Sequence, residues 1–503
     1  MLDTRAVRLI VDKYRTRRQS NKVLHGHPSP GFWLDKHVAV SDVMDQRERA
    51  EASVRKRLNL YVGTPYCLPT EPDRCGFCLF PSEVYRNRQQ LDVYLDYLRR
   101  EGELFRPHLA GAELASIYFG GGTSNLYKAD QYVVLMDIVR NVFEIPPDIE
   151  VTLEGIPQTF SHEKLQAMQD CGINRISMGV QQLDDELIKM SGRKQKAEQV
   201  FRTIESCQDL GLTVSVDLIF GWPSQTIDHM IRDLQAVVDT GIHHITHYEL
   251  NVAGRTDFSK NRRETLPSTE QNLEMYQIGK TFLEANGYHQ VTPYDFERAS
   301  DNQSSNYLYE ELFRHPFQEE EGTVVGFDAW GWGYAGISFF FGTPQEPGWA
   351  YMNEVRIDNY YRALDSNRYP IMRGFHYTEC DLRIHLLFQE LQGLSVSREN
   401  YRAMFGRDVV KDYRAIWQVL EELGWAKIDA AQIEIVGDGI FYLPVIQNLL
   451  SHDQTNEMRK SRSDRPHLAS TLSTPLLLPK SRSHTQHPAS SPNNGSLDKL
   501  TTN

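Results

Sequence analysis

Cysteine is scarce in this chain, with six residues in 503, and long apolar runs are absent. Six thiols are too few for a disulfide framework at this length, and the charged N-terminal stretch MLDTRAVRLIVDKYRTRRQ lacks the apolar core of a secretory signal. We therefore expect a reducing, cytoplasmic compartment. No stretch approaches the roughly 18 apolar residues of a membrane span, so the sequence predicts no membrane-spanning segment.

Positive charge is also in deficit. The 54 lysine and arginine residues face 67 aspartate and glutamate residues, which gives a formal net charge of -13. A chain of this sign does not attract the phosphate backbone of nucleic acids or an anionic membrane. We expect two to four domains with an ample core and no nucleic-acid partner.

Three of the six cysteines lie close together, with the spacing Cys67-x7-Cys75-x2-Cys78. Three thiols suit metal ligation better than a disulfide, which would use two and leave an odd one. Structural zinc sites and iron–sulfur clusters ordinarily take four protein ligands, and no histidine lies between Ser53 and His108. Three interpretations remain open at this point: a cluster with one open iron, a zinc site completed from elsewhere, and ordinary thiols.

Short β-rich runs alternate with amphipathic helical stretches after the thiols, which is the pattern of a parallel sheet. Six runs are strand candidates: residues 58–63, 115–120, 149–154, 175–180, 213–221 and 243–250. The stretches between them repeat apolar residues at helical spacing: residues 90–105, 129–143, 161–172, 196–211 and 226–241. Six βα units predict an incomplete barrel, in which chemistry collects at the carboxyl ends of the strands.

Polar residues follow successive strand candidates. The second run leads into GGGTSN, whose glycines allow the backbone to approach a ligand and to direct N–H groups at an anion, although a glycine-rich turn alone is weak evidence. The third run ends in Glu154, the fourth leads to Gln181, and the fifth contains Asp217. Four such positions around one mouth, above the thiol loop, predict a pocket.

Several longer motifs occur in order over most of residues 58–445: YVGTPYC, IYFGGGT, VTLEG, GINRISMGVQQLDDELIKMSGR, VDLIFGWP, GWGYAGIS and YRAMFGRDVVKDYRAIWQVLEELGWAKID. This set resembles the radical S-adenosylmethionine (SAM) enzymes of the oxygen-independent coproporphyrinogen III oxidase, or HemN-like, type. The resemblance implies an α/β fold, a partial (βα)6 radical SAM barrel with a small C-terminal winged-helix-like domain. The implied domains are an N-terminal extension (1–55), the barrel (56–300), a barrel-closing aromatic segment (301–375), a HemN-like domain (376–450) and a disordered tail (451–503).

The resemblance also implies the cofactors, a [4Fe–4S] cluster and SAM. Cys67, Cys75 and Cys78 would hold the cluster, whose fourth iron binds SAM and directs its reductive cleavage to methionine and a 5′-deoxyadenosyl radical. By the same resemblance, Tyr61 is a catalytic residue and SAM contacts Gly121, Gly122, Thr123, Glu154, Gln181, Arg193 and Asp217. A low-potential electron donor such as flavodoxin or ferredoxin would reduce the cluster.

Some features depart from the family pattern and bear on the reaction. Seven residues separate the first two thiols where the family has three, Gly63 stands in place of a histidine, and the N-terminal segment differs from that of true coproporphyrinogen oxidases. Ser305 replaces the haem-ligating histidine of the haem-chaperone branch, which disfavours haem trafficking. We therefore expect methyl or one-carbon transfer from a second SAM to an unsaturated carbon of an apolar ring-containing molecule. Oxidative decarboxylation of a tetrapyrrole is the alternative.

Two further groups of side chains allow a functional or a structural interpretation. The aromatic residues around GWGYAGISFFFG form either a wall facing a flat substrate or buried strands that close the barrel. Alternation places His243 and His247 on one face of the last strand candidate, so at most one pair reaches the pocket, and we expect structural roles. In the C-terminal region, IEIVGDGIFYL predicts a hairpin.

Overall fold

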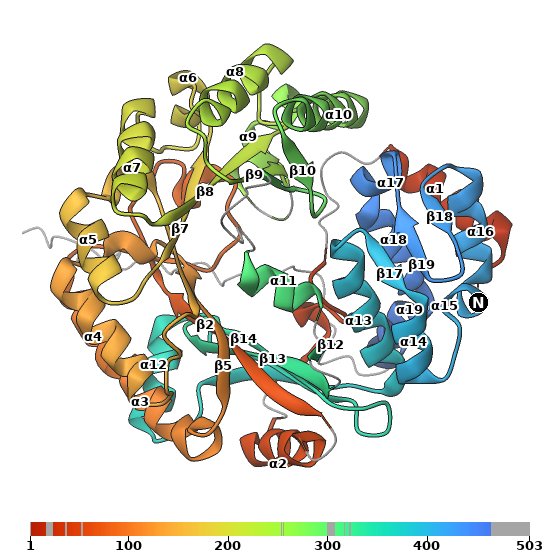
Figure 1. Ribbon diagram of the computed structural model, residues 1–503, viewed down its shortest axis with the longest axis horizontal. Helices are drawn as coiled ribbons and strands as arrows, with labels where there is room; N and C mark the ends of the chain where they lie inside the picture. The colour runs from red at the N-terminus through yellow and green to blue at the C-terminus, as the bar shows by residue number, and fades with distance from the viewer. Residues whose placement is uncertain are drawn as a thin grey trace, which may run out of the picture.

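The computed structural model describes residues 2–16, 24–35, 38–51, 54–252, 254, 256–298, 307–315, 317–320 and 323–463. At its centre, six parallel strands form a curved sheet with helices along its outer side (Figure 1). In spatial order the strands are β2 (Arg55–Thr64), β5 (Glu113–Gly121), β6 (Glu150–Gly155), β7 (Arg175–Gln181), β8 (Thr213–Phe220) and β9 (His244–Glu249). The predicted α/β fold with a partial barrel is therefore confirmed.

The helices between these strands pack their apolar stripe on the sheet. In α7, for example, Val200, Ile204 and Cys207 are buried at helical spacing. Ser161 and Thr226 cap the starts of α5 and α8 by accepting hydrogen bonds from backbone N–H groups. The helices are α3 (Arg88–Leu109), α4 (Ala129–Arg140), α5 (His162–Asp170), α6 (Asp185–Lys189), α7 (Ala197–Asp209), α8 (Ile227–Val238), α9 (Asp257–Asn261) and α10 (Thr269–Ala285). Among the helices described, none is long and apolar enough to cross a bilayer.

The strands after residue 316 extend the sheet from its β2 edge. They are β12 (Phe317–Glu320), β13 (Thr323–Gly333), β14 (Ile337–Phe341), β15 (Gly348–Asn353) and β16 (Ile371–His376), with α12 (Ile357–Asp365) before the last. β13 lies parallel to β2, and β1 (Leu34–Asp35) completes this edge. The opposite edge ends in the antiparallel strands β11 (Asp295–Arg298) and β10 (Tyr288–Gln290). The described strands do not join the two edges, so the sheet remains an open barrel.

The aromatic residues of β13 and β14 form core rather than a wall of the cavity at the strand ends. Trp330 and Trp332 are fully buried, and their rings stack with centroids 4.9 Å apart. Trp332 Nε1 donates a hydrogen bond to the carbonyl of Leu98 on α3 (3.0 Å). The structure therefore supports the structural interpretation of these side chains, and β13 attaches to the β2 edge instead of bridging the barrel's open side.

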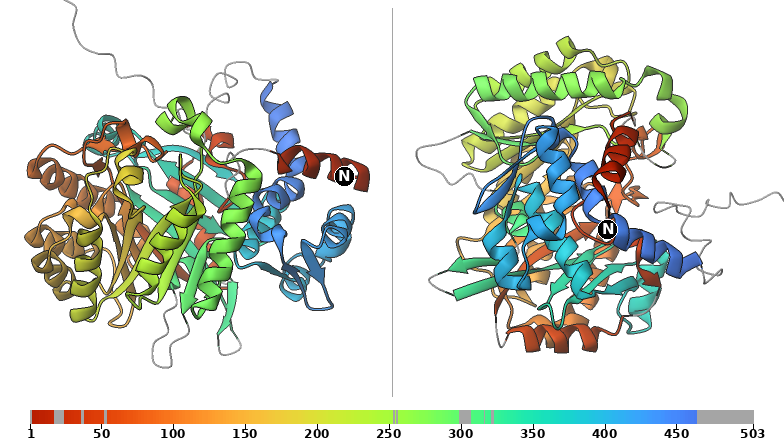
Figure 2. Two further views of the ribbon diagram at one scale, coloured as in Figure 1. Left: turned by 90° about the horizontal axis from the view of Figure 1, so that it is seen from above. Right: turned by 90° about the vertical axis from the view of Figure 1, so that its right-hand side faces the viewer.

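Short helix α11 (Leu308–Arg314) and the C-terminal domain lie at the open side of the barrel (Figures 1 and 2). The predicted N-terminal extension packs partly on the C-terminal domain and partly on the extended sheet. Its first helix, α1 (Thr4–Arg15), packs on the C-terminal domain, whereas α2 (Val40–Glu51) packs on β14 and β15. Reciprocal hydrogen bonds between the Leu24 backbone and the Gln447 side chain (2.7 and 2.8 Å) hold the intervening segment on the same domain.

The C-terminal domain combines helices with a three-stranded antiparallel sheet in the order β17-β19-β18. The predicted hairpin lies earlier than expected, because residues 438–441 are helical and the hairpin joins 426–428 to 432–435. Gly439 permits this helix to pack closely, since a Cβ there would lie 2.4 Å from the Trp425 carbonyl oxygen. The elements are α13 (Glu379–Gln392), β17 (Ser395–Ser397), α14 (Arg398–Phe405), α15 (Val409–Asp412), α16 (Arg414–Glu422), β18 (Ala426–Ile428), β19 (Gln432–Ile435), α17 (Asp438–Phe441) and α18 (Leu443–Leu450).

The predicted tail boundary at residue 451 is wrong. A polar helix, α19 (His452–Ser463), follows the apolar α18, and Gln454 Nε2 donates a hydrogen bond to Asp381 Oδ1 on α13 (2.7 Å). This contact with the domain gives the segment a packing partner that its composition did not reveal. Residues 464–503, the remainder of the predicted tail, lie outside the described part of the chain.

The core position of the β13 aromatic residues has a measurable consequence. Trp332→Ala should lower the free energy of unfolding by roughly 3–5 kcal/mol, because it removes a buried indole and leaves a cavity. Trp349→Ala, at a half-buried position on β15, should cost less. Denaturant titration measures both variants. Near-wild-type stability of Trp332→Ala combined with a selective loss of substrate binding would instead identify the aromatic residues as a substrate wall.

Candidate functional site

A cavity of about 470 Å³ opens at the carboxyl ends of the parallel strands. All of the predicted metal and SAM residues line it: Cys67, Cys75, Cys78, Gly121, Gly122, Thr123, Glu154, Gln181, Arg193 and Asp217. Tyr61 is not among the lining residues. Its ring stacks on Tyr118, which does line the cavity, with ring centroids 5.8 Å apart. The structure thus brings together residues from β3 (Tyr66–Cys67), β5, β6, β7 and β8. Tyr61 on β2 lies behind Tyr118 and does not line the cavity.

The loop that carries Cys75 and Cys78 has a tight conformation of its own. Arg74, Cys75 and Gly76 have φ angles of 53°, 57° and 71°, a left-handed run that L side chains adopt only when the surroundings impose it. The Cys75 N–H donates to Thr70 Oγ1 (3.0 Å), which itself donates to the carbonyl of Pro72 (2.9 Å). The additional residues between the first two thiols therefore form a braced turn.

Gly192 holds this loop against the barrel. It follows α6 and has a φ of +78°, and a Cβ there would lie 2.4 Å from the carbonyl oxygen of Glu71. Only glycine permits this approach of the two backbones. The next residue, Arg193, donates from Nε to Cys75 Sγ (3.4 Å) and from Nη1 to the carbonyl of Gly179 (2.7 Å). Arg193 therefore links the thiol loop to the end of β7.

None of the three clustered thiols forms a disulfide. Burial raises the pKa of the Cys67 thiol, and hydrogen bonds with Ser82 and Thr123 oppose this rise. Burial raises the pKa of the Cys78 thiol to about 11. Buried thiols become thiolates readily when a metal supplies the compensating positive charge. The three side chains are therefore suited to metal ligation and poorly suited to remain as isolated thiolates.

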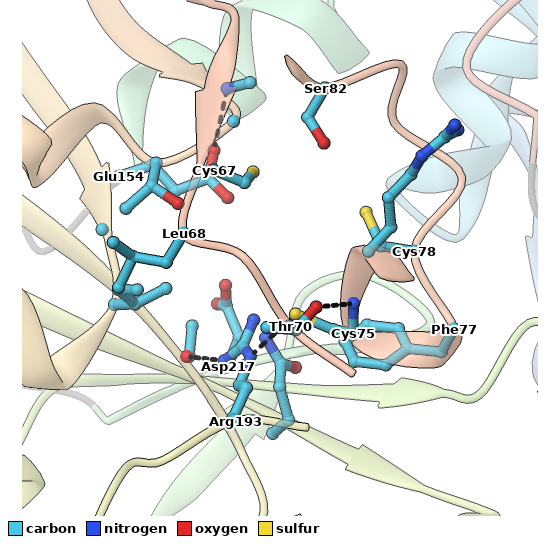
Figure 3. Close-up of a pocket in the computed structure, with 18 of the residues that line it drawn as sticks. Cys67, Leu68, Thr70, Cys75, Phe77, Cys78, Ser82, Glu154, Arg193 and Asp217 are labelled. Carbon is cyan, nitrogen blue, oxygen red and sulfur yellow. Dashed lines mark hydrogen bonds between the residues drawn. The ribbon is translucent and has the colours of Figure 1, made fainter. Parts of the chain in front are cut away.

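The thiols surround a space and do not converge on a point (Figure 3). Within the described residues, no three histidine, cysteine, aspartate or glutamate side chains are close enough to share one metal ion. A structural zinc site would need its ligands around a single ion, whereas a [4Fe–4S] cluster takes each thiolate on a different iron. The donor set and its spacing therefore fit a cluster with one iron left for a non-protein ligand.

The backbone N–H groups at the end of β5 were expected to face a ligand, but they donate to other groups of the protein. The Gly122 and Thr123 N–H groups donate to the carbonyls of Thr64 (2.7 Å) and Tyr66 (2.8 Å), and the Gly121 N–H donates to Glu154 Oε2 (3.3 Å). A Cβ on Gly122 would lie 2.5 Å from the Tyr66 carbonyl oxygen. The glycines thus fasten the end of β5 to the segment leading to Cys67, and a side chain at Gly122 would displace that segment.

Two buried carboxyl groups face the cavity with weakened acidity. Burial raises the pKa of Glu154 to about 7. Burial, together with the negative charges of Glu154 and Asp295, raises the pKa of Asp217 to about 8. Both groups change protonation near neutral pH and can accept hydrogen bonds from ammonium or hydroxyl donors of a bound molecule.

The inner faces of β7 and β9 carry functional residues that the sequence reasoning missed. Arg175 lies two positions before Ser177 on β7, and its Nη2 is 2.7 Å from His244 Nδ1. His244 Nε2 is in turn 3.1 Å from Asp295 Oδ1, and Thr246 Oγ1 donates to the same oxygen (2.8 Å). The period of two along a strand, counted back from Gln181, would have placed Arg175 on the cavity side.

Of the histidines on the last parallel strand, His244, and not the pair His243 and His247, lies on the cavity side of β9. His244 alternates with the cavity-lining Thr246 and Tyr248. His247 points to the opposite side, where its ring lies 4.8 Å from that of Phe220 and burial lowers its pKa to about 3. The structural role expected for His247 agrees with this environment.

Comparisons with known proteins agree with the fold and the thiol loop. The model of the radical SAM superfamily matches residues 67–237. The haem chaperone HemW of Bacillus subtilis is 28% identical over 371 residues, which is 72% of this chain and 91% of that protein. The oxygen-independent coproporphyrinogen III oxidase of Escherichia coli is 28% identical over 334 residues, 64% of this chain and 69% of the relative. Its solved structure, HemN, superposes with a TM-score of 0.72 at 22% identity, over 88% of this chain and 98% of that chain.

The thiol geometry generates the first prediction for the site. After anaerobic reconstitution with iron and sulfide, Cys67→Ala, Cys75→Ala and Cys78→Ala should each lose the iron–sulfur absorbance, because each removes one of three ligands. Cys171→Ala is the matched control, since this thiol is buried in the core away from the cavity, and it should retain a full cluster. Stoichiometric zinc without iron or sulfide in the wild-type protein would contradict the assignment.

The raised pKa of Asp217 generates a second prediction. In the cofactor-free protein, the folded-state pKa of about 8 lies above the unfolded value of about 3.9, so the folded state holds this proton more tightly. The resulting stability is present below pH about 4 and is lost as the pH rises through about 8. Asp217→Asn should therefore flatten the fall in thermal stability between pH 6 and pH 8. The exposed Asp209→Asn should keep the wild-type profile, and identical profiles for both variants would contradict the shift.

Proposed function

The chain belongs to the radical SAM superfamily and is HemN-like, and we propose that it oxidises a tetrapyrrole-class substrate by removing a side-chain carboxylate as carbon dioxide. Its cofactors are a [4Fe–4S] cluster and SAM. The observation that carries the proposal is the joint placement of three thiols, strand-end carboxyl groups and a second, aromatic cavity behind the thiol loop.

Cys67, Cys75 and Cys78 would hold the cluster. The residues that would surround SAM are those at the strand ends: Gly121, Gly122, Thr123, Glu154, Gln181, Arg193 and Asp217. When bound, the two cofactors supply one-electron chemistry at an unactivated carbon. A low-potential donor such as flavodoxin or ferredoxin is the proposed source of the electron.

The chain's own residues prepare the cavity for a charged cofactor. Glu154 and Asp217 would accept hydrogen bonds from SAM and, once deprotonated, would offset a positive charge placed beside them. The Arg193 guanidinium donates to Cys75 Sγ and to the carbonyl of Gly179. It would stabilise the Cys75 thiolate and hold the thiol loop against the end of β7. Tyr61 would act through Tyr118, on which its ring stacks.

The second cavity is suited to a flat ring system. It measures about 330 Å³ and shares Phe77, Cys78, Tyr248 and Tyr307 with the first. The Tyr248 side chain is 42% accessible and faces both cavities, with the ring of Tyr294 at 5.4 Å between centroids. Aromatic faces of this kind favour stacking with an unsaturated ring. A substrate held there would lie next to Cys78 and the cluster.

The comparisons favour oxidation over the methyl transfer expected from the sequence. A relative that aligns with 64% of the chain is an oxygen-independent coproporphyrinogen III oxidase, whereas the methyl-transfer expectation rested on departures at Gly63 and in the N-terminal segment. The thiol spacing, another departure, is accommodated by the braced turn of the loop. Methyl transfer from a second SAM is therefore the weaker candidate.

Haem binding is a second candidate function, because the haem chaperone HemW aligns over 72% of this chain. The histidine that ligates haem in that branch corresponds to Ser305, which lies outside the described residues. The neighbouring Tyr307 lines both cavities, so an aromatic macrocycle could occupy the same place in either function. Turnover of SAM distinguishes the two.

The reconstituted protein should convert coproporphyrinogen III anaerobically, in the presence of reductant and SAM carrying a deuterated methyl group. The expected products are 5′-deoxyadenosine, methionine, carbon dioxide and a vinyl-bearing porphyrinogen without label, as mass spectrometry measures. S-adenosylhomocysteine with label in the product would support methyl transfer instead. Stoichiometric haem binding, without any increase of 5′-deoxyadenosine on adding the porphyrinogen, would support a chaperone.

A further inference from the structure

The second cavity lies between the barrel, the thiol loop and the C-terminal domain. Cys78 and Leu79 of the loop form one wall, and Gln392 at the end of α13 lines it from the C-terminal domain. Asn251, after β9, also lines it, and its Oδ1 is buried without a hydrogen-bond partner in the described structure. The cavity is thus enclosed by several elements and retains unsatisfied polar groups, which are the features of a ligand site.

Helix α11 presents one polar face to this cavity. Tyr307, Glu310 and Arg314 follow one another at spacings of three and four residues, so they lie along the same side of the helix. All three line the second cavity, and the helix lies inside the barrel, where the Leu308 N–H group donates to Glu150 at the start of β6 (Figure 1). The helix therefore presents a carboxyl group, a guanidinium and an aromatic ring to the place proposed for the substrate.

Arg314 is the exceptional residue on this face. Its side chain is only 8% exposed, yet its guanidinium makes no hydrogen bond or ion pair with any residue that the structure describes. Arginine is rarely buried without a partner, because removing a charge from water costs several kcal/mol unless an anion or acceptor replaces the lost hydration. A guanidinium that lines a cavity in this state is poised for an anionic ligand.

Asp295 and Glu310 lie within range of the Arg314 charge, but neither carboxyl group forms a direct ion pair with it in the described part of the chain. The Asp295 carboxylate is already occupied by His244 Nε2 (3.1 Å), Thr246 Oγ1 (2.8 Å) and Thr292 Oγ1 (2.6 Å). Burial and the charge of Asp295 raise the pKa of Glu310 to about 7, and the charges of Arg314 and Arg175 oppose this rise. The positive charge of Arg314 thus remains available to a ligand.

We propose that Arg314 binds a carboxylate of the substrate and fixes the orientation of its ring beside Cys78. This assignment rests on the proposed function. Arginine offers a planar fork that matches the two oxygens of a carboxylate, and the enclosed site strengthens such a pair. The aromatic rings of Tyr248 and Tyr294 hold the ring system, and Arg314 selects molecules that carry an acidic side chain.

The test uses mesoporphyrin IX, which has two propionates, and its dimethyl ester, which has the same ring and no charge. Both ligands are titrated into the reconstituted holoenzyme by quenching of porphyrin fluorescence. Wild type should bind the acid at least tenfold more tightly than the ester. Arg314→Gln should weaken binding of the acid about tenfold, which equals about 1.4 kcal/mol, and leave binding of the ester unchanged. Arg314→Lys should give an intermediate loss for the acid.

Arg362→Gln is the matched control, because this arginine is exposed on α12 and its removal changes the net charge equally. It should bind both ligands as wild type does. The iron–sulfur absorbance and SAM affinity should be unchanged in every variant, which separates this role from cofactor binding. If wild type prefers the acid and Arg314→Gln keeps that preference, the assignment of Arg314 is wrong while the proposed function stands. If wild type binds neither porphyrin, the proposed function fails and the assignment fails with it.

Discussion

The close contact between the end of β5 and the segment leading to Cys67 is the constraint on which the site depends. The Gly122 and Thr123 N–H groups pair with the carbonyls of Thr64 and Tyr66, and no side chain fits at Gly122. These hydrogen bonds fix the first thiol relative to the sheet. Gly192 and Arg193 fix the other two through the loop from Glu71 to Cys75. A cluster ligated by this chain would therefore sit at one defined position above the strand ends.

The parallel sheet concentrates polar groups at that position, and burial changes their properties. Glu154 lies on β6 and Asp217 on β8, and both side chains line the first cavity. Without a ligand, desolvation raises the pKa of both groups, and the charge of Glu154 adds to the rise for Asp217. A cationic ligand reverses this shift, so cofactor binding and carboxylate ionisation are thermodynamically linked.

Sequence reasoning located the parts of the site that repeat with the βα units. Glu154, Gln181 and Asp217 follow from the rule that chemistry collects at the carboxyl ends of parallel strands, and the thiols follow from their spacing. Arg175 was accessible to the same reasoning through the period of two along β7. Asp295 and Arg314 were not, because they lie on the antiparallel strand β11 and on a short helix, both outside the repeat. Their position depends on how distant segments pack, and no local pattern encodes it.

The two cavities are built from different parts of the chain, which explains how one fold can serve related functions. The strand ends form a cofactor site whose geometry is set by backbone contacts, whereas α11, β11 and α13 contribute side chains to the second cavity, which adjoins the first at Cys78, Tyr248 and Glu310. Substitutions at residues that line the second cavity alone, such as Arg314, can alter the substrate without changing the cofactor site. The chain keeps the three thiols and the strand-end residues of the cofactor site, although the spacing of the first two thiols departs from the family pattern.

The central claim is that three thiols leave one iron of a [4Fe–4S] cluster open for SAM. Electron paramagnetic resonance of the reduced, reconstituted protein tests it most directly, with SAM carrying 15N in its amino group. SAM should change the g values of the cluster, and pulsed measurements should detect coupling between the cluster and the 15N nucleus. A spectrum of a reduced [4Fe–4S] cluster that is identical with and without saturating SAM, and without 15N coupling, would contradict the account.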